Sequence, residues 1–231
     1  MKKIPTLFKR VFSPDHKTKT ILPEVTPGCE AVLEGLCTPT VKWDGACCAI
    51  IKGEIYKRYD AKIGKDGKQK QPPEGAIPCQ PEPDPITGHW PHWVKCEVGN
   101  PADKYFFEGV ENSKRIRLCR QTLELIDGTY EAIGPLIQSN PYGFDKHYLI
   151  PHGWDPAQYI IRLMRHTAST PDYEEYRGQV YKTPEDLFSK MKDYLESHYT
   201  EGIVFWYDGE PLCKIKRSDF GFEWPIQEGE R

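Results

Sequence analysis

The stretch Thr40-Val41-Lys42-Trp43-Asp44-Gly45-Ala46-Cys47-Cys48-Ala49-Ile50-Ile51 decides the fold. Asp-Gly pairs favour tight turns, and β-branched and apolar residues flank this pair on both sides. A further strand pattern, residues 55–59, follows Gly53-Glu54. Residues 40–60 therefore predict an antiparallel hairpin with a turn at Asp44-Gly45.

Strand patterns also dominate the rest of the chain. Alternating or aromatic-rich segments predict strands at 90–97, 105–110, 129–133, 202–207 and 212–216, whereas 118–126 suits a helix or a strand. Helix N-terminal signals occur at Asp155-Pro156 and Thr183-Pro184, each followed by apolar residues at helical spacing. Many strands and few helices predict an α+β fold with mainly antiparallel pairing.

One long loop interrupts this pattern. Residues 64–91 contain seven prolines and little apolar periodicity, which predicts a proline-rich surface loop. With 231 residues in total, we expect a single domain spanning 1–231.

Composition limits the classes of protein to consider. The chain has 31 Lys plus Arg against 34 Asp plus Glu, so any nucleic acid must bind a local patch rather than a global basic field. Eight cysteines without a CxxC pair predict free thiols in a reducing cytoplasm. We find no apolar run long enough to span a membrane and no signal-peptide pattern, so we expect a cytoplasmic protein without a membrane partner.

Lys42, two residues before Asp44-Gly45, is a candidate nucleophile, because a neutral lysine amine can attack an electrophilic centre such as phosphorus. An unperturbed lysine amine has a pKa near 10.4 and is protonated at pH 7, so a nucleophilic lysine needs burial or neighbouring cations. Lys214 and Lys216 alternate onto one face of a predicted strand and could supply those charges and bind a phosphate. The alternative for Lys42 is a place in an exposed surface turn. The alternative for Lys214 and Lys216 is an exposed edge strand whose lysines prevent aggregation.

Two glutamates stand where a carboxylate needs a partner. Glu131 lies inside an apolar strand pattern and Glu201 immediately precedes another. Each could coordinate a metal ion or form a structural salt bridge. Arg58 could bind a phosphate or end an exposed strand. His89, His92 and Cys96 have metal-ligand spacing, but without an evident fourth ligand a structural zinc site is disfavoured.

Five segments in order resemble motifs I, Ia, III, IV and V of the covalent nucleotidyltransferases, the superfamily of DNA ligases, RNA ligases and mRNA capping enzymes. These segments are Lys42-Trp43-Asp44-Gly45, Arg58, residues 130–134, residues 201–205 and Lys214-Ile215-Lys216. Connecting stretches such as Gly88-His89-Trp90-Pro91-His92-Trp93-Val94 and Leu149-Ile150-Pro151-His152-Gly153 are similar to the vertebrate-type RNA ligase 1 family, which has bacterial and viral relatives. The resemblance spans about Ile21 to Ile226.

This resemblance implies an ATP-dependent RNA ligase, an enzyme that forms phosphoric-ester bonds between an RNA 5′-phosphate and a 3′-hydroxyl. It implies an adenylation domain whose antiparallel sheets enclose a nucleotide cleft, similar to ATP-grasp folds. Lys42 would carry AMP, assisted by Lys214 and Lys216. Mg²⁺ or Mn²⁺ would bind Glu131 and Glu201. The residues expected to contact the nucleotide are Val41, Asp44, Gly45, Arg58, Glu131, Glu201 and Lys214.

Alternatives remain at this point. A capping-type guanylyltransferase would use GTP, but the chain ends shortly after motif V, so we expect no C-terminal oligonucleotide-binding domain. A catalytically inactive nucleic-acid-binding module would keep the fold alone. For RNA contacts we expect Lys57, Lys62, Lys65 and Lys68, the alternative being a solvated basic face.

Overall fold

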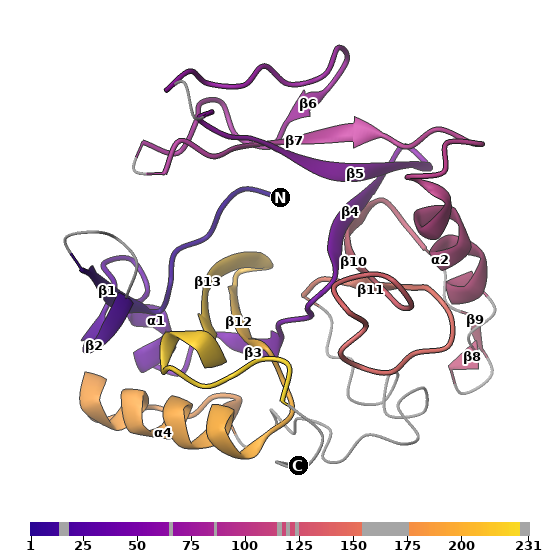
Figure 1. Ribbon diagram of the computed structural model, residues 1–231. Helices are drawn as coiled ribbons and strands as arrows, with labels where there is room; N and C mark the ends of the chain where they lie inside the picture. The colour runs from indigo at the N-terminus through magenta and orange to yellow at the C-terminus, as the bar shows by residue number, and fades with distance from the viewer. Residues whose placement is uncertain are drawn as a thin grey trace. The chain divides into compact units, whose positions relative to one another are not determined.

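The computed structural model describes residues 1–13, 19–64, 67–85, 87–114, 117–118, 121–122, 125–153 and 176–226. The chain forms two compact units (Figure 1). The first unit contains Met1–Lys3 and Asp44–His152, and the second contains Ile4–Trp43 and Gly153–Arg231. The chain therefore passes from one unit to the other within the Lys42-Trp43-Asp44-Gly45 segment.

The first unit is built on a six-stranded antiparallel sheet with the order β11-β10-β4-β5-β7-β6. Its strands are β4 (Ala46–Ile51), β5 (Glu54–Ala61), β6 (Ile77–Pro78), β7 (Trp90–Lys95), β10 (Gly128–Ile133) and β11 (Tyr148–Pro151). Two short strands, β8 (Arg117–Leu118) and β9 (Gln121–Thr122), pair separately.

Helix α2 (Lys104–Lys114) covers one face of this sheet and contacts β10 and β11 (Figure 1). Its buried positions Phe106, Gly109 and Ser113 recur at helical spacing, and Gly109 lets the helix approach Leu149 closely. The prediction of a strand at 105–110 was therefore wrong. Aromatic residues favour strands only weakly, and here packing of a helical face against the sheet decides the structure.

The second unit contains a three-stranded antiparallel sheet with the order β13-β12-β3 and a separate β1-β2 pair. The strands are β1 (Phe8–Phe12), β2 (Lys19–Val25), β3 (Thr38–Val41), β12 (Gly202–Tyr207) and β13 (Glu210–Lys216). Helices α1 (Glu30–Leu33) and α4 (Pro184–Ser197) and the 3₁₀ helix η2 (Arg217–Asp219) complete it. Leu187, Met191 and Leu195 of α4 join the buried core.

The predicted hairpin over 40–60 is half correct. β4 and β5 pair as expected, with Ile50 opposite Ile55. β3 instead pairs with β12, where Val41 lies opposite Ile203, so Asp44-Gly45 is not a hairpin turn. Gly45 is needed for a different reason: a Cβ atom there would lie 2.3 Å from the Ala132 carbonyl oxygen. The glycine thus permits close approach of two backbones.

Strands at 90–97, 129–133, 202–207 and 212–216 are confirmed within a few residues, as is the α4 helix, whose Thr183 side chain accepts from Asp186 N at 3.2 Å. The α+β class is confirmed. In the described part of the 64–91 loop, the one regular element before β7 is β6.

The helix expected from Asp155-Pro156 lies outside the described residues, and 118–126 is described only in part, as short strands. The seven cysteines in the described ranges are free thiols. Across those same ranges, no helix has the length and apolar character needed to cross a membrane.

Candidate active site

Three lysines gather on one face of the β13-β12-β3 sheet. Along β13, Lys214 and Lys216 are half-buried while Cys213 and Ile215 face the core, as the strand alternation predicted. Lys42 follows β3, and its backbone N–H donates to Gly202 O at 2.9 Å, extending the pairing. Gly202 lies opposite Lys216, so it stands between the two lysines. We call Lys42, Lys214 and Lys216 the lysine face.

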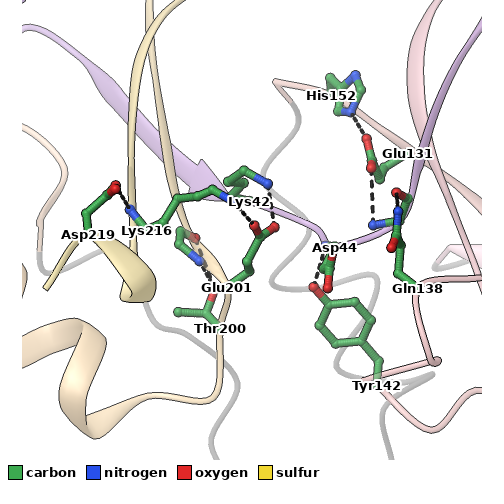
Figure 2. A network of polar contacts seen from close by, with 12 residues as sticks. Lys42, Asp44, Glu131, Gln138, Tyr142, His152, Thr200, Glu201, Lys216 and Asp219 are labelled. Carbon is green, nitrogen blue, oxygen red and sulfur yellow. Dashed lines mark hydrogen bonds and ion pairs between the residues drawn. The ribbon is translucent and has the colours of Figure 1, made fainter. Parts of the chain in front are cut away.

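Glu201 joins two of these lysines. Its carboxylate forms ion pairs with the Lys42 ammonium and, at 2.6 Å, with Lys216 Nζ (Figure 2). The Glu201 side chain is 7% exposed, against 19% for Lys42 and 30% for Lys216. Gly202 is required beside it, since a Cβ would lie 2.2 Å from Ile215 O. One buried carboxylate thus holds two ammonium groups together.

Lys216 is also fixed through its backbone. Its N–H donates to Asp219 Oδ2 at 3.0 Å. Asp219 Oδ1 accepts a hydrogen bond from Arg10 Nη2 at 2.6 Å. Asp219 is buried. Arg10 of β1 is therefore linked to the end of β13, and this contact stabilises the position of Lys216.

In the first unit, Glu131 anchors the backbone that precedes β4. Its Oε1 accepts the Gly45 N–H at 3.2 Å, and Gln138 Nε2 donates to Gly45 O at 3.4 Å (Figure 2). The adjacent Asp44 N–H donates to the Tyr142 hydroxyl at 2.7 Å. These bonds hold the Asp-Gly backbone against β10.

The second oxygen of Glu131 faces a histidine. Glu131 Oε2 lies 3.0 Å from His152 Nε2, and His152 Nδ1 lies 3.1 Å from Thr129 Oγ1. Cys47 is directly opposite Glu131 in the β4–β10 register. One ligand atom from each of Cys47, Glu131 and His152 lies within 4.8 Å of the others. We call these residues the Glu131 triad.

Arg58 borders this triad. Its Nε lies 3.1 Å from Asp60 Oδ1. Burial alone would lower the pKa of Arg58, but Asp60 and Cys47 outweigh it and leave the pKa above its ordinary value. Burial, with Glu131 nearby, raises the pKa of the Cys47 thiol to about 12, although Arg58 opposes this. Arg58 is thus a charged group held in place beside Cys47.

The predicted RNA-contact lysines fall into two groups. Lys57 forms an ion pair with the buried Asp103 at 2.5 Å, on the opposite face of β5 from Arg58. Lys62 and Lys68 are exposed, and Lys65 lies outside the described residues. Contact of these lysines with RNA stays a prediction.

The remaining candidates are separated from these groups. Val41 packs with the core of the second unit. His92 is buried with Nδ1 2.9 Å from Trp90 O, and Cys96 lies in the first unit's core. His89 Nδ1 lies 3.9 Å from Asp60. Within the described ranges, the Glu131 triad is the one group of three ligand-type side chains close enough to share a metal ion, so His89, His92 and Cys96 do not form one.

Residue-by-residue reasoning missed Cys47, His152 and Asp219. Cys47 is one strand position from the hydrophobic Cys48, and nothing local distinguishes the two thiols. His152 stands in one of the stretches that carry the family resemblance, which was the available signal for it. Asp219 follows the last strand, where an acidic residue is typical of a short helix.

Comparison with known proteins finds distant relatives named RNA ligase 1. The chain is 27% identical over 243 residues to the mouse (Mus musculus) protein named RNA ligase 1, covering 81% of this chain and 68% of that protein. It is 26% identical to the orangutan (Pongo abelii) RNA ligase 1, with the same coverage. The zebrafish (Danio rerio) RNA ligase 1 matches at 26% over 63% of this chain and 45% of its own.

These matches support an RNA ligase family for the chain. No family model matches it. The relatives are distant, and their alignment covers most of the chain, in agreement with the resemblance that the ordered motifs suggested.

Proposed function

We propose that the protein is an ATP-dependent RNA ligase that works through a lysyl-AMP intermediate at Lys42. The observation that carries the proposal is the pairing of Lys42 and Lys216 with the buried Glu201, on a sheet face that also holds Lys214. A surface turn would leave the Lys42 ammonium in water. Similarity to proteins named RNA ligase 1 supports the choice of RNA as substrate.

The first step would be attack of the Lys42 amine on the α-phosphorus of ATP. A P–N bond forms, the bond to pyrophosphate breaks, and the ammonium proton must leave before attack. Glu201 already contacts that ammonium and is suited to accept the proton. Lys214 and Lys216 would stabilise the negative charge that develops on the α-phosphate.

Two further steps would complete the reaction. The RNA 5′-phosphate displaces Lys42 from AMP, giving an adenylated RNA end, and the 3′-hydroxyl then displaces AMP to form the phosphodiester. The same lysines would serve all three steps, because each step is a substitution at phosphorus in which negative charge develops on the phosphate oxygens.

Mg²⁺ or Mn²⁺ is part of the proposal. Glu201 offers carboxylate oxygens, the ligands that such cations prefer, whereas both oxygens of Glu131 are already engaged by Gly45 and His152. A bound cation would neutralise charge on the departing pyrophosphate. We propose that Asp44, Gly45 and Arg58 contact the nucleotide, and that the exposed Lys62 and Lys68 contact RNA phosphates.

Adduct formation tests the first step. Wild-type protein incubated with α-labelled ATP and Mg²⁺ or Mn²⁺ should acquire an acid-labile label that Lys42→Ala abolishes. Lys190→Ala, which removes an exposed lysine from α4, is the matched control and should label normally. Absence of label in the wild type, or full labelling of Lys42→Ala, would refute the lysyl-AMP proposal.

Substrate choice needs a second experiment. Sealing should be compared on nicked duplex, single-stranded and hairpin RNAs carrying a 5′-phosphate, with DNA versions as controls. Labelling by GTP in place of ATP would indicate a capping-type guanylyltransferase. RNA binding without any adduct, unaffected by Lys42→Ala, would indicate an inactive binding module.

A further inference from the structure

The Glu131 triad has the composition and preorganisation of a metal site of its own. Cys47 and Glu131 are cross-strand neighbours in the β4–β10 register, which places their Cβ atoms about 5 Å apart. His152 is brought to the same place because its backbone N–H donates to Thr129 O at 3.0 Å, just beyond the end of β11. Three backbone segments of one sheet therefore hold the three side chains.

The hydrogen bonds around the triad leave the ligand atoms facing one another. Glu131 uses Oε1 for Gly45, so Oε2 alone faces His152. Thr129 Oγ1, 3.1 Å from His152 Nδ1, orients the ring and leaves Nε2 toward the carboxylate. Metal-bound histidines are typically oriented by a hydrogen bond to the other ring nitrogen in this way.

The spacing fits a small tetrahedral ion. Zn²⁺ bound to N and O at about 2.0 Å keeps those two ligands about 3.3 Å apart, which needs a shift of a few tenths of an ångström from the observed 3.0 Å. The Cys47 sulfur lies no more than 4.8 Å from either and must approach by about 1.3 Å at most, which a side-chain torsion can provide. The Gly45 contact to Oε1 is kept throughout.

Ligand type selects the ion. A thiolate, an imidazole and one carboxylate oxygen suit Zn²⁺ and not Mg²⁺, which prefers six oxygen ligands. Glu131 and His152 side chains are each 13% exposed, so the site excludes most water yet remains reachable.

We propose that Cys47, Glu131 and His152 bind one Zn²⁺ ion, leaving a fourth coordination position open. Three protein ligands and an open fourth position are the arrangement found in catalytic zinc sites. The proposal does not rest on the proposed function, because metal binding is measured without ATP or RNA.

Cobalt substitution tests the proposal directly. Untagged full-length protein, stripped with a chelator, should bind one equivalent of Co²⁺ with a thiolate-to-cobalt charge-transfer band in the near ultraviolet and tetrahedral bands in the visible. Added Zn²⁺ should abolish these bands, and excess Mg²⁺ should not. No charge-transfer band in the wild type, or displacement by Mg²⁺ as effective as by Zn²⁺, would overturn the proposal.

Variants identify the ligands. Cys47→Ser and Cys47→Ala should lose the charge-transfer band, and His152→Gln should weaken Zn²⁺ binding by more than the roughly 10- to 100-fold that loss of an outer hydrogen-bond partner costs. Cys79→Ser, which changes another half-buried thiol, and His89→Gln are the matched controls and should bind normally. Circular dichroism of each variant monitors folding. A band that survives in a folded Cys47→Ser, or disappears in a folded Cys79→Ser, would show that the triad is not the site.

Discussion

Replacing Glu201 with glutamine should destabilise the second unit strongly. The amide cannot neutralise the ammonium groups of Lys42 and Lys216, which are then held together in a partly buried site. At 2.6 Å and an effective dielectric constant near 20, the Lys216 pair alone contributes an attraction of about 6 kcal/mol before desolvation. Desolvation offsets much of that, and removing one partner of a buried pair typically costs about 3–5 kcal/mol. We expect a loss in that range.

Urea unfolding followed by tryptophan fluorescence measures this loss. Glu210→Gln, which removes an exposed charge from the same β12–β13 hairpin, is the matched control and should change stability by no more than about 0.5 kcal/mol. Adding Lys42→Met to Glu201→Gln should recover about 1–3 kcal/mol relative to the sum of the single changes, because the two side chains contact each other.

A small effect would refute the reasoning. If Glu201→Gln lost less than about 1 kcal/mol, the value typical of an exposed ion pair, the buried carboxylate would not be holding the two lysines. Additive effects in the double variant would lead to the same conclusion. Because this experiment measures unfolding, its outcome is independent of any ligase activity.

Three further predictions concern other parts of the fold. Gly202→Ala should destabilise by about 2–3 kcal/mol in urea, because its Cβ would lie 2.2 Å from a carbonyl oxygen of β13. Burial raises the pKa of Cys96 to about 12, so only about one molecule in ten thousand carries that thiolate at pH 8. A disulfide reagent should therefore modify the half-buried Cys79 well before Cys96. Lys57→Met should cost about 3 kcal/mol, because it removes the counter-ion of the buried Asp103 carboxylate.

Each of these has a control and a contrary outcome. Gly128→Ala places a Cβ no closer than 3.9 Å to any atom and should be tolerated, so equal losses at both glycines would contradict the steric argument. In the thiol experiment, mass mapping of the labelled peptides should find Cys79 labelled before Cys96, and earlier label on Cys96 would contradict the prediction. Lys62→Met removes an exposed lysine nearby, and a stability loss matching that of Lys57→Met would show that the Lys57 ion pair is not the cause.

The sequence predicts structure well where the interacting residues are close together in the chain, and poorly where they are far apart. Short-range signals worked: alternation predicted that Lys214 and Lys216 share a face, and Thr183-Pro184 predicted the start of α4. Pairing of β3 with β12 joins residues more than 160 positions apart, and no local pattern around Asp44 encodes it. The α2 helix was mistaken for a strand because its aromatic residues suit either structure until packing decides.

The same limit applies to the candidate site. Glu131 and Glu201 were predicted because an acidic residue beside apolar neighbours is visible in the sequence. The proximity of Cys47 and His152 to Glu131 arises from the register of β4, β10 and β11, which only the folded sheet provides. A residue type can therefore be selected from sequence, whereas its partners cannot.

The backbone contact at Gly45 has a consequence for inherited variation in this gene. Every missense change at a glycine codon adds at least a Cβ atom, and at position 45 that atom would lie within 3 Å of the Ala132 carbonyl, the Glu131 side chain and Ile133. No conservative replacement exists there. In a saturation-mutagenesis population under selection, codon 45 should therefore retain only synonymous changes, even among substitutions that leave Lys42 intact.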